Sequence, residues 1–184
     1  MAKIYVDANR MMLDSFELAK NIYNSNYIPN DIIGVLEGGI FPAFYIKRYF
    51  TFMGKNVKEY LIPTSKTTKM DKTRKNIDFK MIELINAEIN NDVKNKRNIL
   101  LVDDVIYTGH TLENIIKNLK SNMKEIKIAT IYYNSENNET RIKPDFYLYK
   151  CKKEDLIVFP YRLEEIEVDE IKGINNDLHK ILTT

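Results

Sequence analysis

Apolar residues recur at two different spacings along this chain, and the two spacings predict where its helices and strands lie. Over residues 7–25 the apolar positions return every three or four residues, which predicts an amphipathic helix with Asp7 as its N-cap. From Asp31 to Leu36 the chain is a short apolar run that ends before a glycine pair, which is typical of a buried strand. Pro42 then begins a predicted helix that continues through Phe52. The start of the chain therefore predicts a helix, a strand and a second helix.

The remaining elements follow the same two patterns. Further strands are expected at 57–62, 99–102 and 125–133, and further helices at 77–89 and from 111 to about 122. Two later strands, Asp145 to Lys150 and Leu156 to Phe159, have no long helix between them and are expected to form a smaller appendage. Alternating strands and helices are typical of a parallel sheet that is covered by helices on both faces and binds ligands at the carboxyl ends of its strands. The predicted fold class is α/β, in a single domain that spans residues 1–184.

Composition and charge narrow the class of protein. The 184 residues are 44% hydrophobic and 29% charged, as in a folded soluble protein, and the net charge of +2 gives no reason to expect a nucleic-acid partner. One cysteine, Cys151, and two histidines exclude an internal disulfide and a His/Cys zinc site. Polar residues interrupt the apolar N-terminus, and no run approaches the roughly 20 apolar residues that a membrane span needs. We therefore expect a cytoplasmic protein that does not span a membrane.

The most informative stretch is ILLVDDVIYTGHTL, residues 99–112. An apolar strand there runs into two adjacent acids, Asp103 and Asp104, and then into a loop that contains Gly109 and precedes a helix. A glycine lets the backbone fold closely, so that free N–H groups at the helix start can surround a phosphate. Acids beside such a loop would repel a phosphate unless they address ribose hydroxyls or a Mg²⁺ ion. In isolation the stretch is equally compatible with a capped turn and solvated acids.

The order of these residues resembles the phosphoribosyl-pyrophosphate (PRPP) binding motif of the type I phosphoribosyltransferases. That motif has four apolar residues, two acids, two further residues, a variable one and then Thr-Gly-x-Thr, a pattern that the segment VDDVIYTGHT follows. The resemblance implies that Asp103 and Asp104 hold the ribose 2′ and 3′ hydroxyls. It also implies a loop around the 5′-phosphate, in which His110 contributes its backbone while its imidazole faces solvent. The implied loop residues are Thr108, Gly109, His110 and Thr111.

Other stretches extend the resemblance over most of the chain. IIGVLEGGIFPAFYIKRYF, residues 32–50, is similar to the family's first loop, which implies that Glu37, Gly38 and Gly39 contact pyrophosphate. KPDF at 143–146 and IVFPYRLEE at 157–165 are similar to the C-terminal hood of the hypoxanthine-guanine and xanthine-guanine enzymes. The 6-oxopurine branch is therefore the nearest relative, with a hood implied at roughly residues 1–25 and 143–184. The helix expected at 77–89 is an insertion to which the resemblance assigns no task.

A basic segment lies between the two loops. SKTTKMDKTRK, residues 65–75, has five cations and one acid, and such a run is most often a solvated loop. Its place after the strand at 57–62 matches the family's mobile catalytic loop, which closes over PRPP. The resemblance therefore implies that Lys66 and Lys69 bind PRPP, where cations would stabilise the departing pyrophosphate.

Four positions depart from the usual 6-oxopurine pattern, and two of them lie in the loops. Glu37 stands where a basic residue is usual, so its carboxylate would repel pyrophosphate unless it points away or reaches Mg²⁺ or a basic partner. Tyr107 stands where many purine enzymes have an aspartate near the purine N7. A phenol with a reference pKa near 10 is a poor base at neutral pH, but it can donate a hydrogen bond.

The other two departures concern the base. Asn134 aligns with the lysine that contacts the purine O6. Leu156, which precedes Ile157, aligns with the aromatic residue that stacks on the base. The resemblance implies that these three residues bind the base, and Tyr161 or Phe159 is a candidate for the aromatic face.

The predicted function is Mg²⁺-dependent transfer of the phosphoribosyl group from PRPP to a nucleobase, with a 6-oxopurine as the expected base. The resemblance implies that Asp103, Asp104 and Tyr107 are the catalytic residues, and that the two acids approach the metal through ribose hydroxyls or water. One alternative keeps the chemistry and changes the base to uracil or a modified base. Another is a non-catalytic regulator that senses PRPP or a nucleotide and binds RNA. An apolar helix face between residues 40 and 53 favours a homodimer or a higher homo-oligomer.

Overall fold

The computed structural model describes residues 3–66, 75–90, 96–119 and 123–183. These residues form two compact units, one of residues 12–153 and the other of residues 1–11 with 154–184. The larger unit contains the motif at 99–112 and the glycine pair, and the smaller unit contains the two chain ends.

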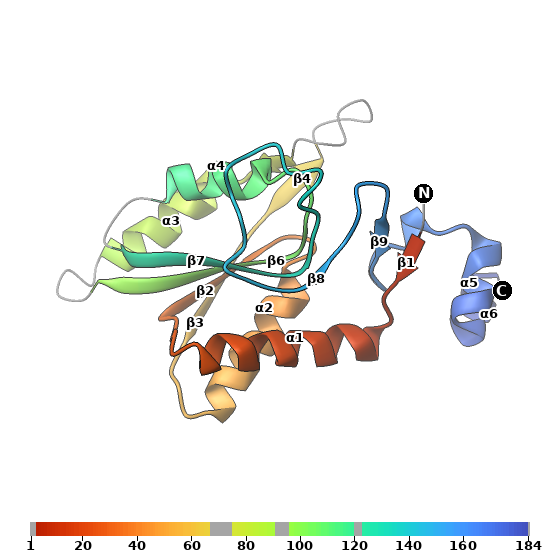
Figure 1. Cartoon of the computed structure of the whole chain (residues 1–184), viewed down its shortest axis with the longest axis horizontal. Coiled ribbons are helices and arrows are strands. Elements are labelled where there is room, and N and C mark those ends of the chain that lie inside the picture. Colours follow the sequence, from red (N-terminus) through yellow and green to blue (C-terminus); the bar gives the residue numbers. More distant parts are fainter. Residues whose placement is uncertain (1–2, 67–74, 91–95, 120–122, 184) are drawn as a thin grey trace. The chain divides into compact units, whose positions relative to one another are not determined.

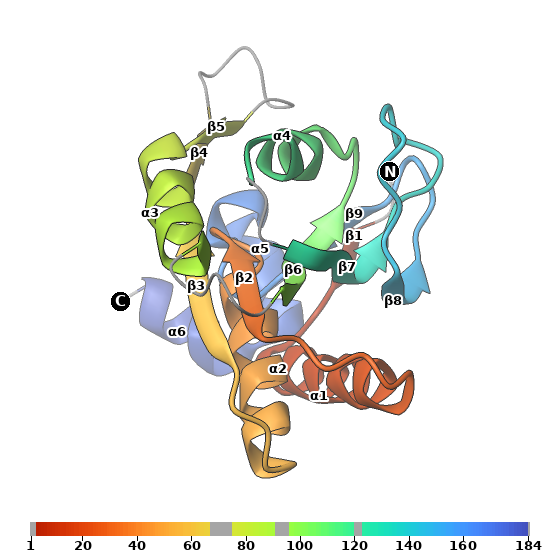
Figure 2. The same cartoon turned by 90° about the vertical axis from the view of Figure 1, so that its left-hand side faces the viewer.

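The larger unit is built on a five-stranded sheet with the order β3-β2-β6-β7-β8, in which every neighbouring pair is parallel (Figure 1, Figure 2). Its strands are β2 (Asp31–Val35), β3 (Lys58–Ile62), β6 (Arg97–Ile106), β7 (Met123–Tyr133) and β8 (Phe146–Lys150). The predicted parallel α/β fold is confirmed. The assignment of residues 145–150 to an appendage is wrong, because β8 pairs with β7 and completes the sheet.

The central strand β6 is longer than predicted. It was expected to end at Val102, but it continues through both acids because its pairing with β7 continues: Asp103 lies opposite Thr130, and Ile106 lies opposite Tyr133. Every residue from 99 to 106 is buried. The two acids therefore lie inside the central strand of the sheet rather than in the loop after it.

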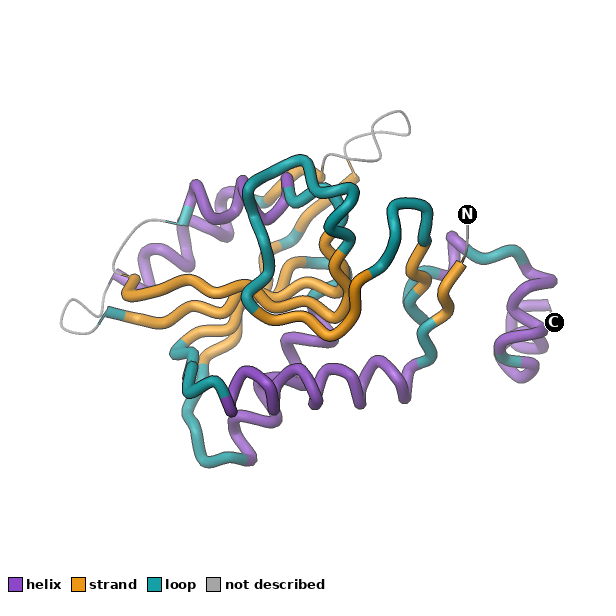
Figure 3. The backbone as a smooth tube through the Cα atoms, in the orientation of Figure 1, coloured by secondary structure: helices purple, strands orange, loops and turns teal. Residues whose placement is uncertain are grey.

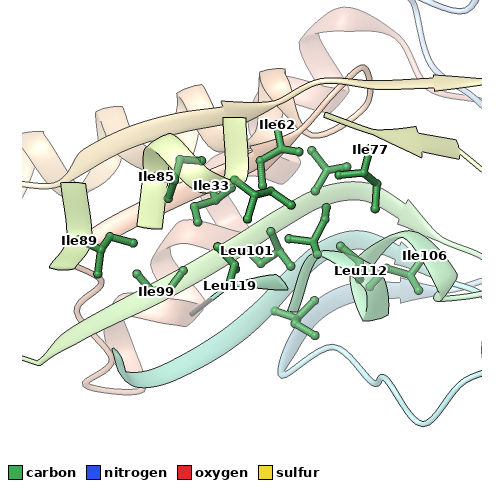
Figure 4. Packing of buried hydrophobic residues seen from close by; sticks show 14 of the residues in the cluster. Ile33, Ile62, Ile77, Ile85, Ile89, Ile99, Leu101, Ile106, Leu112 and Leu119 are labelled. Carbon is green, nitrogen blue, oxygen red and sulfur yellow. The ribbon is translucent and has the colours of Figure 1, made fainter. Parts of the chain in front are cut away.

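Two helices cover one face of the sheet, α3 (Phe79–Asn90) and α4 (His110–Asn118) (Figure 1, Figure 2). Figure 4 shows the core that they enclose with the strands, where Ile85 of α3, Leu101 of β6 and Leu112 of α4 belong to one cluster. Helix α3 falls on the stretch that looked like an insertion. Its task is to bury this face of the sheet.

The opposite face is covered by α1 (Ala8–Asn24) and α2 (Ile40–Phe52) (Figure 1, Figure 2). The predicted N-cap of α1 is confirmed, because Asp7 Oδ1 accepts a hydrogen bond from the backbone N–H of Arg10 at 2.8 Å. The buried side of α1 carries Leu18 and Ile22, which are fully buried. The helical spacing of apolar residues thus predicted both the element and the side that it buries.

A short hairpin leaves the sheet between β3 and α3. Strand β4 (Thr64–Lys66) pairs antiparallel with β5 (Lys75–Ile77), so that Lys66 lies opposite Lys75. Residues 67–74, which connect the two strands, lie outside the described residues. They hold most of the predicted basic loop.

The smaller unit has a two-stranded parallel sheet in which β1 (Lys3–Tyr5) lies beside β9 (Leu156–Val158) (Figure 3). Its remaining elements are a 3-10 helix at Leu163–Glu165 and the helices α5 (Val168–Ile174) and α6 (Asn176–Thr183). This unit is smaller than the predicted hood, since most of α1 and all of β8 belong to the larger unit. No helix among the described residues is long and apolar enough to cross a membrane.

Candidate functional site

The two adjacent acids lie near the carboxyl end of β6. Asp103 is 5% exposed and Asp104 is 1% exposed. Oδ1 of Asp103 accepts a hydrogen bond from the N–H of Asp104 at 3.0 Å, and Oδ1 of Asp104 accepts one from the N–H of Val105 at 2.7 Å. Burial of carboxylates costs free energy unless polar partners compensate. Two of them at the ligand edge of a parallel sheet are therefore typical of a binding role.

The glycine pair lies directly against β6. A Cβ atom on Gly38 would lie 2.2 Å from Cγ and Oδ1 of Asp104, and a Cβ atom on Gly39 would lie 2.2 Å from the carbonyl oxygen of Val102. Side chains at these positions would collide with the strand, which explains why the sequence has glycine at both. The structure thus brings the predicted pyrophosphate loop into contact with one of the predicted ribose-binding acids.

Glu37 precedes the glycine pair and is exposed. The peptide bond between Leu36 and Glu37 is cis, and Gly39 is the N-cap of α2. An exposed carboxylate can turn away from an anion in the loop, so the acid at this position does not prevent the glycine backbone from approaching one. Contact between Glu37 and PRPP stays a prediction.

The loop after β6 has the geometry expected of a phosphate loop. Gly109 has a φ of 83° and a ψ of −10°, in the left-handed region that favours glycine, and it is the N-cap of α4. The first N–H groups of a helix have no partner within the helix and favour an anion. Thr108 and Thr111 are half-buried on either side, as is Tyr107 at the end of β6. The residues that the motif predicted for the phosphate therefore lie together at one helix start.

His110 has a partner that its prediction did not include. Its imidazole, expected to face solvent, is partly exposed, and its Nε2 lies 2.9 Å from Oε2 of the exposed Glu139, in the loop between β7 and β8. The backbone N–H of Glu139 also donates to the carbonyl oxygen of Thr108 at 3.0 Å. Sequence reasoning missed this contact, because nothing in the local pattern of either loop signals the other.

The predicted base-binding asparagine is engaged within the chain. Asn134 is fully buried; its amide donates to the carbonyl oxygen of Lys152 at 2.7 Å, and its Oδ1 accepts from the N–H of Asn137 at 3.0 Å. These bonds hold the end of β7 against the chain after β8. Base recognition by Asn134 stays a prediction.

The other predicted base-binding residues lie in the smaller unit. Ile157 is fully buried in β9, and Leu156 beside it is half-buried. The ring of Tyr161 stacks on that of Phe159, with centroids 5.5 Å apart and planes within 7°. Phe159 is fully buried, so Tyr161 is the more accessible aromatic of the two.

The basic segment was predicted to contact PRPP through Lys66 and Lys69. Lys66 is the last residue of β4, and Lys69 lies outside the described residues. Their contacts with PRPP stay predictions.

A metal at this site would depend on the substrate for most of its ligands. The described residues contain no cluster of three His, Cys, Asp or Glu side chains that could hold a metal ion. Mg²⁺ is commonly bound through one or two carboxylates together with substrate phosphates and water. The neighbouring carboxylates of Asp103 and Asp104 fit a Mg²⁺ ion that arrives with a phosphorylated ligand.

An open groove lies elsewhere on the larger unit, between the end of α2 and the start of β3. It has a volume of about 780 Å³. It is lined at the amino end of β3, by residues that include Lys47, Lys58 and Tyr60. Since the acids and the phosphate loop lie at the carboxyl ends of the strands, this groove is separate from the candidate site.

The parallel sheet and the two loops at its ligand edge define an α/β protein of the kind that binds phosphorylated ligands at strand ends. Residues 1–167 match the phosphoribosyl transferase domain, and the chain therefore belongs to that family. A search among curated proteins finds none that matches this sequence.

Solved structures give the same fold. A purine phosphoribosyltransferase from Pyrococcus horikoshii is 25% identical, with a TM-score of 0.62 over 88% of this chain and 94% of that chain. A hypothetical protein from Neisseria gonorrhoeae with bound ppGpp is 17% identical, with a TM-score of 0.69 over 96% and 97% of the two chains. The Helicobacter pylori xanthine-guanine-hypoxanthine phosphoribosyltransferase is 18% identical, with a TM-score of 0.61 over 93% and 99%.

Proposed function

We propose that this protein transfers the phosphoribosyl group from PRPP to a nucleobase, so that pyrophosphate leaves and a nucleoside 5′-monophosphate forms. The contact between Gly38 and Asp104 carries the proposal, because it joins the loop predicted for pyrophosphate to the acids predicted for ribose. Pyrophosphate and ribose are the two groups between which the bond breaks. Membership of the phosphoribosyl transferase family supports the same conclusion.

The two acids stabilise the reacting sugar. Bond breaking at the anomeric carbon runs ahead of bond making, so positive charge develops on the ribose ring. The carboxylates of Asp103 and Asp104 hold the ribose hydroxyls and supply negative charge close to that ring. Because both are fixed in the central strand, little reorganisation is needed as the charge develops.

The two loops hold the phosphates. Backbone N–H groups around Gly109 bind the 5′-phosphate at the start of α4, and the backbone of Gly38 and Gly39 faces the pyrophosphate. Mg²⁺, when bound with PRPP, neutralises charge on the leaving pyrophosphate. Lys66 and Lys69 are proposed to approach the same pyrophosphate from the basic loop.

A 6-oxopurine is the proposed base. The purine enzyme from Pyrococcus horikoshii, at 25% identity over 88% of this chain, supports a purine substrate. Asn134, Leu156 and Ile157 are the proposed base-binding residues, and Tyr107 is the proposed hydrogen-bond donor near the base. Asn134 is fully buried, so its side chain would have to become accessible to contact a base directly.

The experiment that tests this function is turnover with PRPP, Mg²⁺ and a panel of nucleobases. Hypoxanthine, guanine, xanthine, adenine and uracil are supplied singly, and pyrophosphate release is measured together with the nucleoside monophosphate product. We expect turnover with a 6-oxopurine. If the protein prefers uracil, the proposed purine substrate is wrong. If no base gives turnover, the proposed transferase activity is wrong.

A regulatory role is the second candidate function. Its specific support is the Neisseria gonorrhoeae protein, which has the same fold over 96% of this chain and holds ppGpp. Glu37, in place of a basic residue before the glycine pair, is consistent with weaker pyrophosphate binding. Calorimetric titration with ppGpp and with PRPP, alongside the turnover assay, separates the two: a regulator binds a nucleotide and releases no pyrophosphate.

We also propose that the chain self-associates through α2. Three phenylalanines of this helix, Phe41, Phe44 and Phe52, are exposed, and Phe52 is 87% exposed. Exposed aromatic side chains grouped on one helix favour an interface. Sedimentation velocity of the parent and of Phe52→Asp tests this; a dimer that dissociates in the variant is expected, and a monomeric parent would contradict it.

A further inference from the structure

The loop between β7 and β8 lies against the phosphate loop residue by residue. Its residues 138–140 meet residues 108–110. The N–H of Glu139 donates to the carbonyl oxygen of Thr108 at 3.0 Å, and the Glu139 carboxylate meets Nε2 of His110 at 2.9 Å. Between these contacts, a Cβ atom on Gly109 would lie 2.3 Å from Oγ1 of Thr140. The phosphate loop therefore packs against this second loop.

The second loop is braced from within by Asn138. Oδ1 of Asn138 accepts from the N–H of Thr140 at 2.9 Å and from its hydroxyl at 3.0 Å. The Asn138 amide donates to the Tyr133 hydroxyl and to the carbonyl oxygen of Ile142. One side chain thus sets the position of Thr140 beside Gly109.

A different asparagine ties the same loop to the chain after β8. The Asn137 amide donates to the carbonyl oxygen of Lys153 at 2.9 Å, and the carboxylate of Glu136 accepts from the N–H of Lys153 at 3.0 Å. None of the hydrogen bonds found for Asn137 or Glu136 reaches residues 108–111 in the described part of the chain. The loop therefore contains two pairs of like residues. Glu139 contacts the phosphate loop directly and Asn138 acts on it through Thr140, whereas the hydrogen bonds of Asn137 and Glu136 go to Asn134 and Lys153.

This arrangement bears on ligand affinity. Gly109 adopts a left-handed conformation, and glycine has more backbone freedom than any other residue, so a loop around it samples many arrangements unless neighbours restrict it. Phosphate binding at a helix start requires several N–H groups to point at one place. Restriction before the ligand arrives lowers the entropy lost on binding.

We propose that Asn138 and Glu139 are positioning residues for the 5′-phosphate: they hold the loop 108–111 in its binding conformation and contact no substrate themselves. This inference rests on the proposed function, since it takes the ligand of that loop to be the 5′-phosphate of PRPP. The β7–β8 loop then increases the affinity for the sugar phosphate but not the affinity for pyrophosphate. The pyrophosphate loop at Gly38 has separate neighbours and keeps its own affinity.

The test compares matched variants within one loop. Asn138→Ala is compared with Asn137→Ala, and Glu139→Ala with Glu136→Ala. Calorimetry gives the dissociation constants for ribose 5-phosphate and, separately, for pyrophosphate with Mg²⁺. For Asn138→Ala we expect ribose 5-phosphate to bind about tenfold more weakly, because a half-buried oxygen that accepts hydrogen bonds from two donors is lost. For Glu139→Ala we expect ribose 5-phosphate to bind about threefold more weakly, as for loss of a partly exposed hydrogen bond.

A positioning role predicts a selective loss. Pyrophosphate should bind within about twofold of the parent in all four variants, and the KM for PRPP should rise with kcat little changed, as for lost uniform binding. A general loosening of the fold would instead weaken both ligands and lower the melting temperature in the control variants as well. If Asn138→Ala does not fold, the result for Glu139→Ala alone tests the positioning role, because that variant keeps the hydrogen bonds between Asn138 and Thr140.

The outcomes separate this inference from the proposed function. Equal ribose 5-phosphate affinity in the parent, Asn138→Ala and Glu139→Ala overturns the positioning role and leaves the proposed function standing. The positioning role is also overturned if the control variants lose as much affinity for ribose 5-phosphate, or if Asn138→Ala and Glu139→Ala lose as much affinity for pyrophosphate. A parent that binds neither ribose 5-phosphate nor PRPP overturns the proposed function and this inference together.

Discussion

Gly38 lies so close to Asp104 that no side chain fits between them: a Cβ atom on the glycine would lie 2.2 Å from the carboxylate carbon. Gly38 lies in the loop after β2, whereas Asp104 lies within strand β6, 66 residues further along the chain. Their contact joins the predicted pyrophosphate loop to the predicted ribose site. The position of the Gly38 backbone therefore limits where the Asp104 carboxylate can lie.

We predict that Gly38→Ala lowers kcat/KM for PRPP by at least about tenfold. The added methyl group must displace either the Asp104 carboxylate or the loop, and a misplaced electrostatic partner costs transition-state stabilisation. The control is Gly173→Ala in α5, where a Cβ atom meets nothing within 4 Å. Steady-state kinetics of the two variants checks this, and parent-like kinetics for Gly38→Ala would show that the contact does not matter to the reaction.

The acids themselves give the second prediction. Asp103→Asn together with Asp104→Asn should reduce turnover by on the order of 10²-fold or more, because preorganised charge beside the ribose is lost while the side-chain shapes are kept. Circular dichroism of the double variant verifies that the sheet survives. Turnover at the parent rate in a folded double variant would remove these acids from the ribose.

Local spacing predicted most elements of the fold. Helix α1 and its N-cap Asp7 could be predicted because helical periodicity and capping are decided by neighbours in the sequence. The strand β2 before the glycine pair could be predicted for the same reason. Sequence also places Asp103, Asp104 and Gly109 in one motif, and the structure brings them to the same edge of the sheet.

Pairing between distant segments could not be predicted from local spacing. β8 belongs to the main sheet because it pairs with β7, and β6 extends through the acids because β7 continues beside it. The inward-facing amide of Asn134 and the contact between His110 and Glu139 depend in the same way on chain that is distant in sequence. Such contacts are set by tertiary packing, which one segment's pattern of polar and apolar residues does not contain.

A third prediction concerns a buried ion pair at the amino ends of the strands. The Arg97 guanidinium donates to both carboxylate oxygens of Asp31, through Nε at 2.5 Å and Nη2 at 2.6 Å, and the Asp31 side chain is fully buried. Arg97→Ala leaves that carboxylate buried without this partner, so we expect a loss of about 3 to 5 kcal/mol in the free energy of unfolding. Urea denaturation measures it.

The matched comparison is an exposed pair at the same end of the sheet. Lys58 meets Glu88 at 2.8 Å, with about half of each side chain exposed, so Lys58→Ala should cost less than about 1 kcal/mol. The double variant Asp31→Leu with Arg97→Met should be more stable than Arg97→Ala, since it removes both charges. If Arg97→Ala and Lys58→Ala lower the free energy of unfolding by the same amount, burial does not set the cost of breaking these ion pairs.

The fourth prediction concerns stability at alkaline pH. Burial raises the pKa of the Tyr27 phenol well above its usual value, with a further contribution from the nearby Glu125 carboxylate, and its hydroxyl donates to the carbonyl oxygen of Ile99 at 2.6 Å. The unfolded chain loses this proton near pH 10 while the folded protein keeps it, so stability falls as pH rises above about 10. Between pH 8 and pH 11 the parent should lose up to about 1.4 kcal/mol more than Tyr27→Phe.

Urea denaturation of the two proteins at both pH values measures this difference. Tyr147→Phe is the control, because Tyr147 is 38% exposed. An identical pH dependence for the parent and Tyr27→Phe would show that Tyr27 ionises as readily in the folded protein as in the unfolded chain.

The last prediction separates two reasons for glycine at position 109. A side chain there meets both a left-handed backbone, with φ of 83°, and the Thr140 hydroxyl, 2.3 Å from the Cβ position. Gly54 has a similar φ of 72° but open space around its Cβ position, so Gly54→Ala should cost roughly 1 kcal/mol of stability and leave ligand binding unchanged. Gly109→Ala should in addition weaken ribose 5-phosphate binding by about tenfold or more, because the new methyl group pushes the phosphate loop away from Thr140. Adding Thr140→Ala to Gly109→Ala removes the Oγ1 collision and keeps both the backbone strain and the bond from the residue 140 N–H to Asn138, so binding should recover in part. If calorimetry shows no recovery, the collision is not the cause.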